Sequence, residues 1–165
     1  MGEPNKYKHI IVICTVLGVI IPGIEFFYDH SSKQPSTPNP VTEVKITYPS
    51  NFSTVNMNDT LSGIAKNIPE GKELYILVYA PGVNKYYPQN NRMHITDDMW
   101  SVPIWVGLKS DVGEQFDIIA VIADKDAQVA YTSYMITCNK TNERPGLADI
   151  LSGSKECDKI TVIRK

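Results

Sequence analysis

The chain has 165 residues and a formal net charge of -2, from 16 basic and 18 acidic side chains. This length predicts about one globular domain. The near balance of charge excludes a general nucleic-acid binder, which needs a concentrated basic face. A hydrophobic content of 42% excludes wholesale disorder, and three cysteines are too few for a disulfide-dense miniprotein.

An apolar segment near the N-terminus predicts a transmembrane anchor at residues 9–28. Residues 10–24 carry no charge, and Phe26, Phe27 and Tyr28 follow where the membrane interface would lie. At 1.5 Å rise per residue, residues 10–28 span about 28 Å, close to the thickness of a hydrocarbon core. A cleaved signal peptide and a buried soluble helix are the alternatives. No A-x-A-like cleavage step follows the segment, and Pro22 is better tolerated in lipid than in a soluble helix.

The charges beside the anchor predict its orientation. Lys6 and Lys8 precede it, whereas only Lys33 follows closely, beside Asp29. The positive-inside tendency makes residues 1–8 a cytoplasmic tail and exports the rest. A Pro- and Ser-rich linker at residues 29–40 would join the single-pass anchor to the domain at residues 41–165.

Short stretches of alternating hydrophobicity follow the linker, separated by turn residues. One of them, residues 74–80, is apolar on both faces, which is typical of a central strand. Residues 116–123 form the most hydrophobic stretch outside the anchor. Residues 128–138 are expected to run back beside 116–123 after a turn at 124–126, and residues 147–151 to form one helical turn. The remaining expected strands are 44–48, 60–65, 85–89, 93–96, 100–106 and 159–163.

This number and spacing of strands predict an all-β fold. The domain is expected to be an immunoglobulin-like antiparallel β-sandwich, with the N-terminal transmembrane helix outside it. A small closed barrel is the alternative.

The order of several short motifs resembles an accessory module of prokaryotic membrane-anchored and regulatory proteins. The motifs span about residues 43–123, and the last forty residues have no counterpart in the module. The resemblance implies an immunoglobulin-like or fibronectin-like fold, with no catalytic residues to carry over. The motifs are Tyr48-Pro49-Ser50, Leu61-Ser62-Gly63, Tyr86 to Gln89, Trp100, Val106-Gly107 and Phe116 to Val121.

Two cysteines of the domain predict a disulfide bond. Cys138 and Cys157 would lie in an oxidising compartment if the domain is exported. The bond would close a loop of about 20 residues and stabilise the domain by about 3 kcal/mol. Two free thiols are the alternative, and Cys14 lies unpaired in the anchor.

Enzyme chemistry has few side chains to use. His94 is the only histidine after the linker, so a Ser-His-Asp triad would have to use it, although it lies in a polar loop. A zinc site would also need His94, and the sequence around it lacks the spacing of metal ligands. The acidic pairs at residues 97–98 and 124–126 fit turns better than a calcium site. We therefore predict no catalytic residues, no metal and no cofactor.

The aromatic residues are the remaining candidates for contact with a partner. If exposed, two or three of them could form a flat platform for sugar rings or a peptide strand, and Tyr86, Tyr87 and Trp105 are the candidate contacts. The alternative is that the aromatic group, Trp100 especially, is ordinary sandwich core. Three sequons offer glycosylation acceptors at predicted turns. Their acceptor residues are Asn51, Asn58 and Asn139.

Together these features predict a non-enzymatic, single-pass membrane protein that displays a binding domain outside the membrane. It would contact the lipid bilayer through residues 9–28 and a protein or polysaccharide through the domain, but not nucleic acid. The alternative is a cytoplasm-facing ligand-sensing or effector module coupled to the anchor. A formed Cys138–Cys157 bond would favour the first, and free thiols the second.

Overall fold

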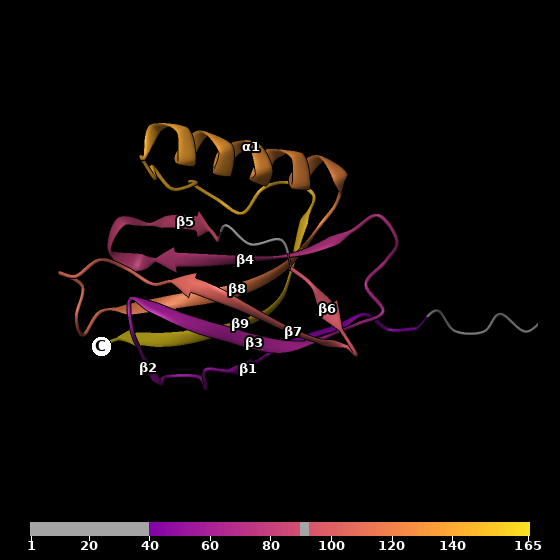
Figure 1. Ribbon diagram of the computed structural model, residues 1–165, viewed down its shortest axis with the longest axis horizontal. Helices are drawn as coiled ribbons and strands as arrows, with labels where there is room; N and C mark the ends of the chain where they lie inside the picture. The colour runs from indigo at the N-terminus through magenta and orange to yellow at the C-terminus, as the bar shows by residue number, and fades with distance from the viewer. Residues whose placement is uncertain (1–39, 90–92) are drawn as a thin grey trace, which may run out of the picture. The chain divides into compact units, whose positions relative to one another are not determined.

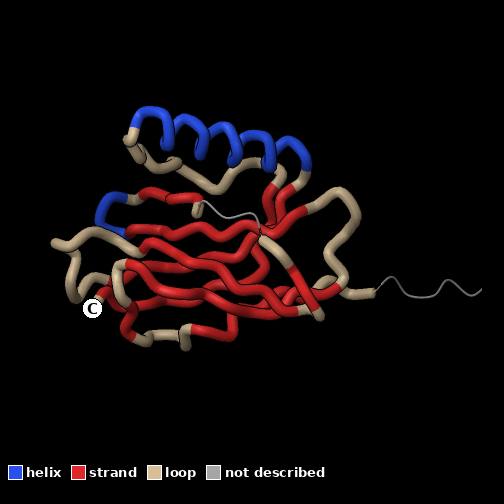
Figure 2. The backbone as a smooth tube through the Cα atoms, in the orientation of Figure 1, coloured by secondary structure: helices blue, strands red, loops and turns tan. Residues whose placement is uncertain are grey.

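The computed structural model describes residues 40–89 and 93–165. Two β-sheets pack face to face, and a helix covers the outer face of one of them (Figures 1 and 2). Sheet A has the strand order β1 (Glu43–Tyr48), β3 (Asn58–Lys66), β7 (Met99–Trp105), β6 (Ile95–Thr96). Sheet B has the order β2 (Thr54–Val55), β9 (Ser154–Arg164), β8 (Gln115–Ala123), β4 (Glu73–Ala80), β5 (Lys85–Pro88). The β-sandwich prediction is confirmed at this level.

Neighbouring strands are antiparallel except β2 and β9, which are parallel. The sandwich core lies between the sheets, because alternate residues of each strand point inward. Ile76 and Val78 of β4 meet Ile118 of β8 there, together with Val102 and Ile104 from the opposite sheet.

A second apolar cluster lies on the other side of sheet B. The intervening residues of β4 and β8 point outward and pack under α1 (Lys125–Thr141). Leu77, Ile119 and Val121 meet Ala127 and Tyr131 of the helix there. Sheet B is therefore buried on both faces, which explains why its two central strands are apolar throughout.

The prediction of a strand at residues 128–138 is wrong, because this segment belongs to α1. Asp124 is the N-cap, and its side chain accepts a hydrogen bond from the Ala127 N–H at 3.1 Å. The Asp124-Lys125-Asp126 segment therefore begins a helix instead of making a turn. The buried residues of α1 recur at helical spacing: Ala127, Gln128, Tyr131, Met135 and Cys138.

The expected helical turn at residues 147–151 is also wrong, since no helix is assigned there. Leu147 instead forms a β-bridge with Tyr86, through two backbone hydrogen bonds of 2.7 and 3.0 Å. Residues 128–138 were expected to pair with β8, but β9 pairs with it instead. This strand begins at Ser154, five residues before the expected start at Lys159. The all-β prediction is therefore too narrow for this domain.

The predicted tail, anchor and most of the linker fall in residues 1–39, outside the described residues. Among the residues that the structure describes, no helix combines the length and apolar character needed to cross a bilayer.

Candidate binding surface

Trp105 is the most exposed of the large aromatic residues predicted to contact a partner. It ends β7, and 52% of its surface is accessible. Its indole N–H donates to the Gly107 carbonyl at 2.8 Å, and its backbone N–H donates to Gln89 Oε1 at 2.8 Å. An exposed indole fixed in this way offers contact area at a low entropic cost of ordering.

The loop that follows Trp105 carries two more exposed apolar side chains. Leu108 and Val112 are 63% and 65% accessible. Asp111 holds the loop together, because its carboxylate accepts hydrogen bonds from Ser110 Oγ at 2.7 Å and from the Leu108 N–H at 2.8 Å. These two bonds lower the pKa of Asp111. Hydrogen bonds within the loop therefore fix the backbone that carries Leu108 and Val112.

The outer face of sheet A continues this surface. Cross-strand rows place Asn58 beside Trp105, Ser62 beside Ser101, and Ile64 beside Met99. The outward residues of β7 are exposed and uncharged: Met99, Ser101, Pro103 and Trp105. The outward row of β7 suits a partner that brings apolar or hydrogen-bonding groups, whereas charge on this face lies on β1 and the end of β3, at Glu43, Lys45 and Lys66. We call Trp105, Leu108, Val112 and the outward residues of β7 the Trp105 surface.

Gln89 is a positioning residue that the sequence did not reveal. Its amide N–H donates to the Tyr87 carbonyl at 3.0 Å, while its carbonyl oxygen accepts from Trp105. The side chain thus joins the end of sheet B to the end of sheet A, directly behind the indole. The only sequence signal was its place at the end of the Tyr86-to-Gln89 motif.

Tyr86 and Tyr87 do not join Trp105 as exposed contacts. Tyr86 is half-buried and packs on Tyr79, with ring centroids 4.6 Å apart. Burial and then the neighbouring Tyr79 raise the pKa of Tyr86. Tyr87 is also half-buried, against the sandwich core. Both tyrosines therefore pack mainly against other residues of the domain and leave little surface for a partner.

Cys138 and Cys157 are free thiols in the structure. Cys138 is buried on α1, whereas Cys157 packs against the sandwich core on the opposite side of sheet B. The predicted bond is absent because the sheet lies between the two layers. Burial raises the pKa of the Cys157 thiol. Burial, followed by interaction with Cys138, raises the pKa of Tyr134 to about 12.

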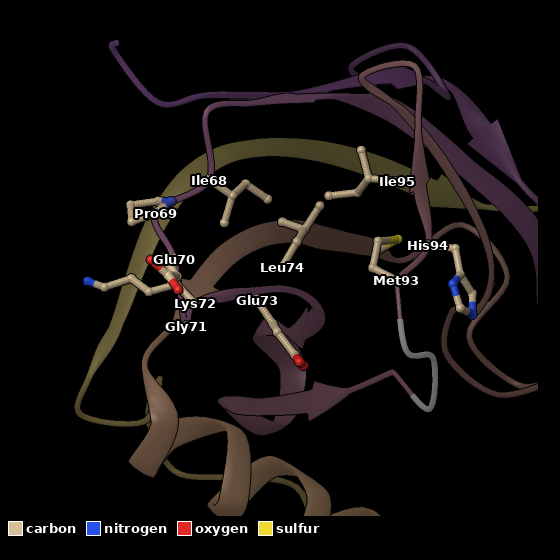
Figure 3. A pocket seen from close by; sticks show the side chains of 10 residues that line it. All are labelled: Ile68, Pro69, Glu70, Gly71, Lys72, Glu73, Leu74, Met93, His94 and Ile95. Atoms are coloured by element: carbon tan, nitrogen blue, oxygen red, sulfur yellow. The ribbon is translucent and has the colours of Figure 1, made fainter. Parts of the chain in front are cut away.

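Two open hollows lie away from the Trp105 surface. The first, of about 420 Å³, lies where β3 leads into β4 and contains His94 on its rim. Figure 3 shows Ile68, Leu74 and Ile95 turned toward one another, while His94 points away from them. The second, of about 520 Å³, runs between α1 and the start of β4. Within the described ranges, no three His, Cys, Asp or Glu side chains gather as a metal site.

The three sequons lie in different local structures. Asn51 lies in a turn, but its side-chain oxygen already accepts a hydrogen bond from the Thr161 N–H at 2.8 Å. Asn58 begins β3 opposite Trp105, so a glycan there would stand beside the indole. Asn139 lies in the last turns of α1 and not in a loop as predicted.

No protein-family model matches this chain, and no curated protein matches its sequence.

Proposed function

We propose that this protein is a non-enzymatic binding module, held on a membrane by residues 9–28 and contacting a partner through the Trp105 surface. The observation that carries the proposal is an exposed Trp105 whose indole N–H and backbone N–H each donate one hydrogen bond, beside the exposed Leu108 and Val112. Aromatic anchors flanked by apolar side chains are typical of protein interfaces. We therefore favour a protein partner over a polysaccharide.

The Trp105 surface lies at the end of the sandwich away from the start of the described chain. That chain begins beside the end of β3, where Asn67 Nδ2 donates to the Val41 carbonyl at 3.0 Å. Trp105 pairs with Asn58 at the start of the same strand, so it lies at the opposite end of the sandwich (Figure 1).

We further infer that the sandwich is immunoglobulin-like. Immunoglobulin sheets have the strand orders ABED and CFG. Reading β1, β3, β4, β6, β7, β8 and β9 as A to G supports this assignment, because sheet A then has the order A-B-E-D and sheet B contains G-F-C. The helix α1 would be an insertion between strands F and G. The inter-sheet disulfide of antibody domains has no counterpart, since β3 and β8 contain no cysteine.

The alternative function is a ligand-sensing or effector module that faces the cytoplasm. The cysteines do not separate the two functions, because sheet B keeps Cys138 and Cys157 apart in either compartment. The hollow beside His94 would then be the site for a small ligand, because it is bordered by the apolar Ile68 and Leu74. The position of the domain relative to the membrane separates the two functions.

Photo-cross-linking tests the proposed contact. A photoreactive amino acid at Leu108 of the full-length chain should give a discrete protein adduct in native membranes, and Trp105→Ala should remove most of it. The same probe at Val83, which is 60% accessible on a different loop, is the matched control. Equal adducts from both positions, or an adduct insensitive to Trp105→Ala, would reject the Trp105 surface as the contact site.

A further inference from the structure

The outer face of α1 carries a regular stripe of exposed side chains. Their spacing alternates between three and four residues, which centres the stripe opposite the residues that pack on sheet B. Along one edge, Val129, Ser133 and Ile136 also border the hollow between α1 and the start of β4. Among the described elements, none lies over this face (Figure 1). Val129 and Ile136 are 56% and 62% accessible. The whole stripe consists of Asp126, Val129, Ser133, Ile136 and Lys140.

The middle of this face contains no charge. From Ala127 to Asn139 the sequence has no Asp, Glu, Lys or Arg, although exposed helix faces are usually charged. Thr137 donates its hydroxyl to the Ser133 carbonyl at 2.9 Å, so this polar group is already satisfied within the helix. The stripe itself therefore has charge only at its two ends, Asp126 and Lys140, which are opposite in sign. The exposed Lys125 flanks Asp126 beside the stripe.

We propose that two copies of the chain pair through this face, with their α1 helices antiparallel and the two Ser133 residues at the two-fold axis. Asp126 and Lys140 each lie seven residues from Ser133, about 10.5 Å along the axis. An antiparallel pair therefore places Asp126 at the level of the partner's Lys140, twice. Val129 then lies within about 1.5 Å of the level of the partner's Ile136.

Charge complementarity selects a second copy as the occupant. The face is acidic at one end, basic at the other and apolar between, so it is complementary to itself when reversed, as an isologous interface requires. Opposed helix dipoles favour the same arrangement. A parallel pair would instead bring Asp126 against Asp126. This pairing depends on α1 alone and not on the Trp105 surface or the membrane anchor.

Disulfide cross-linking at the two-fold axis tests the pairing directly. Packed helices lie 8–10 Å apart, which leaves residues on their contact line close enough for a disulfide. Full-length Ser133→Cys, oxidised in its native membranes with copper phenanthroline, should run mainly as a covalent dimer on non-reducing gels. The matched control is Ser101→Cys, an exposed serine on sheet A, and the unsubstituted chain gives the background from its own cysteines. A Ser133→Cys dimer no stronger than that of Ser101→Cys would overturn the proposal.

Charge reversal tests the antiparallel register. In the Ser133→Cys background, Asp126→Lys or Lys140→Asp alone should lower the cross-linked fraction about fivefold, since two ion pairs become repulsive. The double reversal should restore cross-linking, because it exchanges both partners of each pair. Circular dichroism would check that each variant keeps its helix. A double variant that cross-links no better than the single variants would exclude this register.

Discussion

The outer faces of the two sheets differ, although both belong to one sandwich. The outer face of sheet B is covered by α1, and Leu77, Ile119 and Val121 are buried beneath it. The outer face of sheet A carries no further layer among the described residues, and β7 there alternates buried and exposed positions. A strand that is apolar throughout requires cover on both sides, whereas an alternating strand leaves one face available for contact.

The largest expected effect comes from the covered face. Tyr131 is fully buried, stacks on Tyr75 at 5.0 Å, and its hydroxyl lies 3.0 Å from Ser154 Oγ. Tyr131→Ala should lower the free energy of unfolding by about 3–5 kcal/mol, because it leaves a large cavity between helix and sheet. Trp105→Ala on the open face should cost less than about 1 kcal/mol. Guanidinium unfolding of the full chain in detergent would measure both, and equal losses would remove the distinction between the faces.

Gly63 tests the packing of Trp100 on the inner face of sheet A. A Cβ atom at Gly63 would clash with the Trp100 ring and with the Lys45 carbonyl oxygen. Gly63→Ala should therefore destabilise the domain by about 1–3 kcal/mol. Gly82→Ala is the matched control, since nothing lies within 4 Å of its added Cβ. A tolerated Gly63→Ala would show that β1 and Trp100 are not packed as described.

The N-cap of α1 should have a smaller effect. Asp124→Ala removes the acceptor of the Ala127 N–H and should cost about 1 kcal/mol. Asp126→Ala, an exposed change in the first helical turn, should cost less. Thermal unfolding followed by circular dichroism would compare the two. Equal costs would mean that Asp124 does not anchor the layer that covers sheet B.

The smallest effect concerns the loop of the open face. The pKa of Asp111 is lower in the folded chain, so its stabilising bonds are fully present above the unfolded pKa of about 3.9 and are lost as the pH falls below it. Protection of the Leu108 amide from hydrogen exchange, corrected for intrinsic rates, should fall over that range. Asp111→Asn should show weak protection at every pH. Unchanged protection in this variant would mean that another group orders the loop.

Much of the sandwich could be predicted from the sequence, because period-two alternation directly reports which strand face is buried. The apolar run at residues 74–80 correctly predicted an interior strand, and the one at residues 116–123 is the central strand β8. The same runs also required a third layer, which the prediction did not supply. Residues 128–138 read as a strand because their β-branched and aromatic residues satisfy strand propensity, whereas the cap at Asp124 and the packing on sheet B select a helix.

The candidate surface was less predictable. Trp105 is exposed because it takes an outward position in the alternation of β7, whereas Tyr86 and Tyr87, which were expected to be the more exposed pair, are half-buried. The contacts that fix it come from Gln89, sixteen residues away, and from a turn at Gly107, where φ is +64°. Such long-range hydrogen bonds leave no periodic signal. The same limit explains why the Cys138–Cys157 bond was wrongly predicted. The sequence does not show that sheet B separates the two residues.

The side of the membrane on which the domain lies is the most direct test of the account. Ser110 is exposed in the loop beside Trp105, and Ser110→Cys places a reactive thiol there. A membrane-impermeant maleimide added to intact cells should label this variant of the full chain well above the unsubstituted chain. Labelling that appears only after the cells are lysed would contradict display outside the membrane and favour the cytoplasm-facing module.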